Sequence, residues 1–152
     1  MAIDVQFAVE IEEPPAADLV KAAEAVMRRL RKQARETEVC LRIVDTDESR
    51  YLNETYRGKD KATNVLSFPA DIALPEGETR ILGDIAICDS VVRAEAEAQR
   101  KPLEAHYAHM VVHGMLHLYG YDHEDPKDAD AMEDIEREVL GRLGFADPYG
   151  ES

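Results

Sequence analysis

The sequence has little cysteine, and the cysteine it has is not arranged for bonding. Only Cys40 and Cys88 occur, far apart in apolar stretches and without a CxxC pair. Small domains that depend on disulfides usually carry a larger, closely spaced and even-numbered set. The sequence therefore argues against a disulfide framework and predicts buried core thiols in a reducing compartment.

Long apolar runs are also missing. No stretch approaches the ~20 consecutive apolar residues that a membrane-spanning helix needs. The N-terminal segment MAIDVQFAVE lacks the basic start and continuous apolar centre of a signal peptide. Its apolar and polar residues alternate instead, as in a strand. We expect a cytoplasmic protein without a membrane partner, folded as a single domain over residues 1–152.

Positive charge is scarce, with 18 Lys and Arg against 32 Asp and Glu, a net charge of −14. Nucleic acids usually meet a basic face, so this balance argues at first against such a partner. However, residues 21–61 carry 11 basic against 8 acidic residues, whereas residues 122–138 carry 2 against 9. The basic run RRLRKQAR (28–35) fits a solvated helix face and a phosphate-binding face equally well. If RNA binds, we expect contact through 21–61, with the acidic segment turned away.

Hydrophobic periodicity predicts an α+β fold. We expect a single domain with a small mixed four-stranded β-sheet and most of about five or six helices on one face. The strand within residues 64–72 contains Pro69 and should lie at a sheet edge, because proline cannot donate to a neighbouring strand. The other strands are expected near residues 3–9, 38–44 and 81–89. The helices are expected near residues 16–35, within 45–60, and over 90–100, 103–119 and 127–143.

The stretch HGMLHLYGYDH (113–123) has the spacing of a metal site. His113 and His117 are four apart on a predicted helix, so their imidazoles project from one face. Gly120 permits the left-handed turn that ends the helix and lets His123 return to the same point. Three histidines leave one corner of a tetrahedron open, as in catalytic sites. We predict one Zn²⁺ per chain on these histidines, with nickel or another divalent metal as the alternative.

Gly114 stands where a zinc peptidase of this spacing carries its glutamate base. Peptide hydrolysis needs a base for water and an acid for a poor amine leaving group. Phosphodiester cleavage depends more on neutralising charge on the transferring phosphoryl group and on aligning the attack. A three-histidine loop without this glutamate therefore favours phosphate chemistry.

Other polar residues near the loop have two interpretations each. His106 and His109 lie on the same helical stripe as His113. Along the helix axis they are about 10 Å and about 6 Å from His113, too far to share its metal easily. Both are expected to be core histidines, and His109 is alternatively a group that supports a ligand or touches substrate. Asp84 is a cleft carboxylate or a strand-positioning group. Asp122 orients a ligand imidazole or is a solvated loop acid.

The histidine pattern resembles the H-x3-H-x5-H signature of the YbeY family, bacterial single-strand-specific endoribonucleases and rRNA maturation factors. NETYRGKDKATNVLSFP (53–69) resembles a second family signature, and GDIAIC (83–88) a third. The resemblance implies zinc on the three histidines and a substrate cleft lined by Arg57. It also implies a role in maturing rRNA ends, especially of the small subunit, and in ribosome quality control.

Arg57 suits this chemistry, because a guanidinium makes bidentate hydrogen bonds to phosphate oxygens. Without the resemblance Arg57 would be interpreted as an ordinary loop cation; with it, we assign catalytic roles to Arg57 and His113 in a zinc-dependent endoribonuclease. The expected partners are single-stranded rRNA and the small ribosomal subunit or its assembly factors, and no DNA. The alternatives are a metzincin-like zinc metallopeptidase, with a base such as Glu124, and a non-catalytic zinc-containing ribosome-assembly factor.

Overall fold

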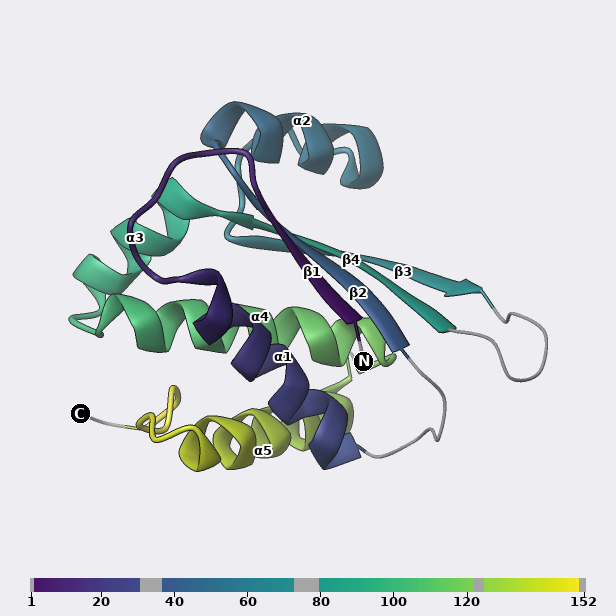
Figure 1. Ribbon diagram of the computed structural model, residues 1–152, viewed down its shortest axis with the longest axis vertical. Coiled ribbons are helices and arrows are strands. Elements are labelled where there is room, and N and C mark those ends of the chain that lie inside the picture. Colours follow the sequence, from purple (N-terminus) through teal and green to yellow (C-terminus); the bar gives the residue numbers. More distant parts are fainter. Residues whose placement is uncertain (1, 31–36, 73–79, 122–124, 151–152) are drawn as a thin grey trace.

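The computed structural model describes residues 2–30, 37–72, 80–121 and 125–150, which form four strands and five helices around one sheet (Figure 1). The strands are β1 (Ala2–Phe7), β2 (Thr37–Val44), β3 (Val65–Ile72) and β4 (Arg80–Cys88). The helices are α1 (Ala16–Leu30), α2 (Thr46–Arg57), α3 (Asp89–Ala98), α4 (Leu103–Leu118) and α5 (Pro126–Arg142). Each predicted element is present, although the predicted end of the first helix, at 31–35, lies outside the described residues.

The sheet is mixed, as predicted, with strand order β1-β2-β4-β3. β1 and β4 both run parallel to β2, whereas β3 is antiparallel to β4. β3 lies at an edge, which confirms the expectation drawn from Pro69. Pro69 faces Gly83 of β4, and the pairing becomes irregular directly after it, because proline has no N–H to continue the ladder.

Most of the described helices cover one face of the sheet, as predicted, and α2 is the one among them that lies over the other (Figure 1). α4 is central, because it contacts β3 and β4 as well as α1, α3 and α5. Its first turn is partly exposed, and from His106 on most of its side chains are buried. None of the described helices is long and apolar enough to cross a membrane. The helix that carries the predicted metal ligands is therefore held on several sides.

Two apolar clusters stabilise the domain. The larger one lies between the sheet and α1, α4 and α5 and includes the fully buried Leu41, Ile85 and Leu116. The smaller one lies under α2 and includes Cys88, which is 1% exposed. Cys88 is thus the expected core thiol, whereas Cys40 is only half-buried, and both thiols are free.

Candidate metal centre

The last turns of α4 bring His113 and His117 together. Their Nε2 atoms lie 3.1 Å apart, and both side chains are half-buried. A tetrahedral zinc with Zn–N bonds of ~2.0–2.1 Å separates two ligand nitrogens by about 3.3 Å. The pair therefore fits two neighbouring corners of a zinc site. Gly120 adopts the predicted left-handed conformation, with φ of 98°.

The predicted third ligand, His123, lies outside the described residues, as do Asp122 and Glu124. Their roles stay predictions.

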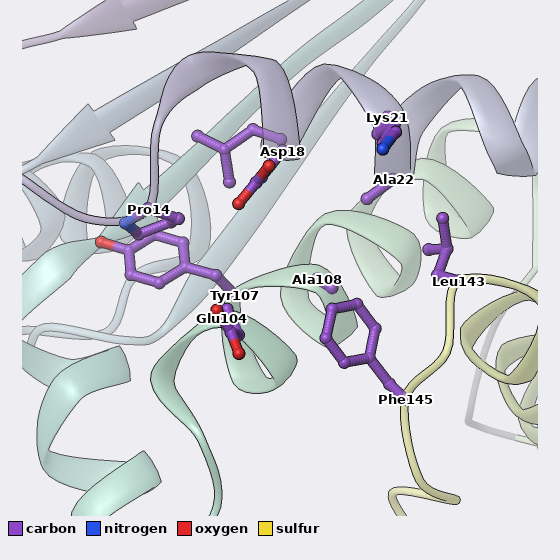
Figure 2. A pocket seen from close by; sticks show the side chains of 10 residues that line it. Pro14, Asp18, Lys21, Ala22, Glu104, Tyr107, Ala108, Leu143 and Phe145 are labelled. Atoms are coloured by element: carbon purple, nitrogen blue, oxygen red, sulfur yellow. The ribbon is translucent and has the colours of Figure 1, made fainter.

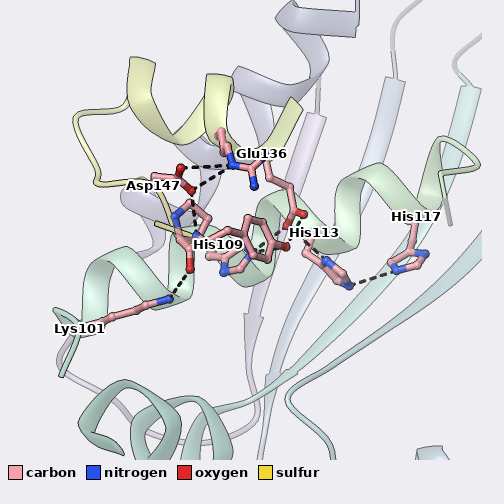
Figure 3. Close-up of polar contacts among 9 residues, drawn as sticks. Lys101, His109, His113, His117, Glu136 and Asp147 are labelled. Carbon is pink, nitrogen blue, oxygen red and sulfur yellow. Dashed lines mark hydrogen bonds and ion pairs between the residues drawn. The ribbon is translucent and has the colours of Figure 1, made fainter. Parts of the chain in front are cut away.

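Glu136 of α5 lies behind His113 (Figure 3). Its Oε2 is 2.8 Å from His109 Nε2 and 3.3 Å from His113 Nδ1. Its Oε1 accepts a hydrogen bond of 2.7 Å from the Tyr149 hydroxyl. The ligand atoms of His109, His113 and Glu136 all lie within 4.8 Å of one another, so this group could hold a metal ion. His113 is common to this group and to the pair with His117.

The Glu136 side chain is fully buried, at 0% exposure. Burial alone would raise the pKa of this carboxyl, but the hydrogen bonds from His109, His113 and Tyr149 outweigh it and lower the pKa to about 2. Glu136 is consequently an ionised carboxylate at neutral pH. A buried negative charge of this kind is stable only because several donors surround it.

The sequence interpretation missed Glu136, since it placed residues 122–138 away from the site as an acidic surface. The sequence nevertheless contained a signal that Glu136 is buried. Glu136 falls between Met132 and Leu140 at spacings of four, and all three side chains are buried on one face of α5. An acid within an apolar stripe is rarely buried without a partner, so this position pointed to one. Nothing in the sequence singled out Tyr149.

His106 is a core histidine, in line with expectation. It is 3% exposed, and its Nε2 lies 3.0 Å from Glu95 Oε1, which also accepts a hydrogen bond from Asn64. Burial lowers the pKa of His106, although the bond to Glu95 acts in the opposite direction. His109 is also buried, at 9% exposure, but it contacts Glu136 and thereby adjoins the candidate site.

Gly114 marks the point where α4 meets the sheet. An added Cβ would lie 2.9 Å from Ile85 Cγ2 and 3.2 Å from Ser67 Oγ. The Ser67 hydroxyl donates a 3.0 Å hydrogen bond to the Gly114 carbonyl. A glutamate therefore has no room at this position, and the structure gives a packing reason why the peptidase base is absent here.

We expect Gly114→Ala to destabilise the protein. Overpacking against the branched, fully buried Ile85 costs about 1–3 kcal/mol, whereas replacing a helical glycine by alanine gains about 1 kcal/mol. The net loss in unfolding free energy should be up to ~2 kcal/mol, measured by denaturant unfolding. Gly141→Ala in α5 is the matched control. No contact within 4 Å in the described chain opposes its added Cβ, so this variant should be as stable as the parent or slightly more. Equal stability of both variants would show that Ile85 has room to move.

Arg57, the predicted catalytic arginine, is the last residue of α2. Gly58 follows it with a left-handed φ of 69° and caps the helix. The loop beyond is tied to α2 by two buried side chains. Asn53 Nδ2 donates to Lys61 O at 2.8 Å, and the Ser49 hydroxyl bonds the backbone N–H and carbonyl of Thr63, both at 3.0 Å. The signature stretch 53–69 thus contains a loop of fixed shape between α2 and β3.

The structure does not join Arg57 to the histidines. α2 lies across the sheet from α4 (Figure 1), and no hydrogen bond or ion pair within the described chain links Arg57 to His113 or His117. Asp84 is exposed on the α2 side of the sheet, where it lines a groove of about 410 Å³ with Arg42. The functional roles predicted for Arg57 and Asp84 therefore stay predictions.

A second hollow, of about 130 Å³, lies between α1, α4 and the segment after α5 (Figure 2). Tyr107 and Phe145 line it, together with Asp18 and Glu104, and no predicted site residue does. Tyr107 is itself fully buried and donates its hydroxyl hydrogen bond to Asp89. This hollow is therefore a packing feature and not part of the candidate centre.

Comparisons with known proteins confirm the family resemblance of the sequence. The profile of the family described as Endoribonuclease YbeY matches residues 4–144. A protein named Endoribonuclease YbeY from Stenotrophomonas maltophilia is 56% identical over 127 residues, covering 82% of this chain and 79% of its own. One of the same name from Cellvibrio japonicus is 58% identical over 121 residues, covering 80% and 68%. The solution structure of TM1509 from Thermotoga maritima is 26% identical with a TM-score of 0.59, and the match covers 97% of this chain and 99% of that one. The chain belongs to the YbeY endoribonuclease family.

Proposed function

We propose that this chain is a zinc-dependent endoribonuclease that cleaves single-stranded RNA, with the ends of small-subunit rRNA as its substrate in ribosome maturation and quality control. The observation that carries the proposal is the pair of Nε2 atoms, on His113 and His117, held 3.1 Å apart at the end of α4. Family membership supports the choice of RNA over peptide.

His113, His117 and His123 would hold the metal, one ion per chain. The two described histidines fit because they are half-buried imidazoles whose nitrogens converge, and imidazole is a preferred zinc ligand. When bound, the ion would supply Lewis-acid chemistry and lower the pKa of a coordinated water to about 7. His113 would act in catalysis as a ligand.

Arg57 would bind the phosphate whose charge grows during cleavage. It is exposed and lies at the end of a helix whose following loop is fixed by Asn53 and Ser49. A substrate strand can therefore reach the guanidinium from solvent. Because α2 and α4 lie on opposite faces of the sheet (Figure 1), contact of one phosphate with both Arg57 and the metal would require the two ends to approach each other. Bidentate hydrogen bonds would then stabilise the phosphoryl group as it transfers.

The charge of the chain determines how strongly it attracts RNA from a distance. Arg29, within the basic run, forms an ion pair with Glu138 of α5, so part of this run is neutralised locally. With a net charge of −14, long-range attraction for RNA should be weak. We therefore propose that binding to the small subunit or to an assembly factor brings the enzyme to its rRNA in the cytoplasm.

Chelation paired with substrate comparison tests this function. Zinc-loaded, chelated and reloaded protein would each be incubated with labelled single-stranded RNA, its duplex, DNA of the same sequence, and casein. We expect cleavage of the single-stranded RNA alone, loss of activity on chelation and recovery on reloading. Circular dichroism on the chelated sample would show that the fold persists.

Two outcomes would contradict the proposal. Cleavage of casein without cleavage of RNA would indicate a peptidase that takes its base from outside α4. Loss of the fold on chelation, without turnover of either substrate before it, would indicate structural zinc in an assembly factor.

A further inference from the structure

We propose that Glu136 and Tyr149 form a positioning relay that holds His113 in the tautomer and orientation that bind metal. This inference rests on the proposed function, in which His113 and His117 are ligands. The relay runs from the segment after α5, through α5, to α4. In Figure 3, His109, His113 and His117 follow one another along α4, and Glu136 reaches toward them from α5.

The tautomer follows from the hydrogen-bonding chemistry of a carboxylate. Glu136 can only accept, so His113 must carry a hydrogen on Nδ1, the atom 3.3 Å from Oε2. In a neutral imidazole the other nitrogen then carries no hydrogen. That nitrogen, Nε2, is the atom directed at His117. Glu136 thus leaves a lone pair where the metal would bind, and its negative charge makes this nitrogen a stronger donor to a metal.

Glu136 is itself held by neighbours on both sides. His109 Nε2 approaches Oε2 at 2.8 Å, and the Tyr149 hydroxyl donates to Oε1 at 2.7 Å. Because the side chain is fully buried, no solvent competes for these bonds, and the carboxylate has one orientation. His109, whose own Nδ1 is buried without a hydrogen-bond partner in the described structure, would act only through Glu136.

Tyr149 is held in turn by two contacts of its own and by one contact of the neighbouring Pro148. Its N–H donates to Asp147 Oδ1 at 2.8 Å, and the Arg137 guanidinium lies over its ring, 5.2 Å from the centroid. Lys101 Nζ donates to the neighbouring Pro148 carbonyl at 3.1 Å. The family profile ends at residue 144, so the tyrosine lies beyond the matched region, whereas Glu136 lies within it. The segment after α5 would thereby support the metal site at a distance.

A competing arrangement places the metal directly among His109, His113 and Glu136. The contacts favour the relay, because Glu136 already receives three donors at hydrogen-bond distances. A metal at that point would replace hydrogens that now satisfy a buried charge. It would also leave the convergent Nε2 atoms of His113 and His117 unused.

Zinc affinity of the folded protein tests the relay without using activity. Metal-free protein would be titrated with Zn²⁺ against a chromophoric chelator, and its thermal unfolding recorded in parallel. We expect Glu136→Gln to weaken binding by about 10–100-fold. Tyr149→Phe should weaken it by about threefold to tenfold, equivalent to one hydrogen bond.

The controls are Glu138→Gln, two residues along α5 in an exposed ion pair, and the exposed Tyr51→Phe. Both should bind zinc like the parent.

Imidazole ¹⁵N spectra of the metal-free protein give a second readout, which a purely structural role would not change. His113 should show hydrogen on Nδ1 in the parent and a mixture of tautomers in Glu136→Gln. If Glu136→Gln does not fold, Tyr149→Phe, which keeps its ring contacts, decides the question by the same two measurements.

The outcomes separate this proposal from the proposed function. Parent-like zinc affinity and tautomer in the folded relay variants, with zinc lost in His117→Ala, would overturn the relay alone. Zinc retained in His117→Ala but lost in His109→Gln and Glu136→Gln would move the metal to the competing group and overturn both.

Discussion

His117→Ala should lose both bound zinc and RNA cleavage while remaining folded. Removing one of three ligands leaves too few for tight binding at neutral pH. The His117 side chain is half-buried and outside the main apolar cluster, so the variant should unfold like the chelated parent. Elemental analysis should show a fall from about one zinc per chain to nearly none, and the RNA assay should give only background.

The matched control is His106→Gln on the same helix. Glutamine can still hydrogen-bond Glu95, the partner of His106 at 3.0 Å, and this residue lies away from the His113–His117 pair. The control should keep its zinc and its activity. Undiminished zinc in His117→Ala would refute the assignment of the metal loop.

Arg57→Ala should keep its zinc and its stability but cleave RNA more slowly by ~10²–10³-fold, the usual effect of removing one transition-state donor. Arg57 is exposed at the end of α2, so truncating it removes no core packing. Arg57→Lys should recover only part of the rate, because an ammonium lacks the planar pair of donors. Single-turnover cleavage of one labelled RNA at saturating enzyme would measure both variants.

Lys59→Ala is the control for charge alone, since it removes one exposed cation two residues away. A general loss of attraction for RNA would slow both alanine variants alike. A contaminating nuclease would be insensitive to either substitution. If Arg57→Ala cleaves like the parent while His117→Ala is inactive, the arginine has no catalytic role.

The sequence predicts this fold best where one residue determines the local backbone. Asp45 accepts the Glu48 N–H at 2.8 Å and begins α2, and Gly58 ends it. Gly120 ends α4 as expected, and Pro69 marks the edge strand. Such positions depend on bond rotation and on available hydrogen-bond donors, both of which are properties of the residue itself.

Contacts between elements were harder to predict. Glu136 meets His113 only because α5 packs on α4, and a helix pattern does not reveal which neighbour a buried acid will face. In β4, alternation separates Ile85 from Asp84 and Ala86, but β4 is apolar on both faces. The sequence therefore does not show which face α2 covers, and so it could not tell that Arg57 and Asp84 lie across the sheet from the histidines.

The close approach of Gly114 to Ile85 also limits how this metal site could change during evolution or in design. A glutamate at 114 would require α4 to move away from the sheet. Because His113 precedes this position and His117 follows it by one turn, both imidazoles would move with the helix. Peptide-cleaving chemistry is therefore not one substitution away from this site. It would require a different helix position, supported by a different set of strand residues beneath it.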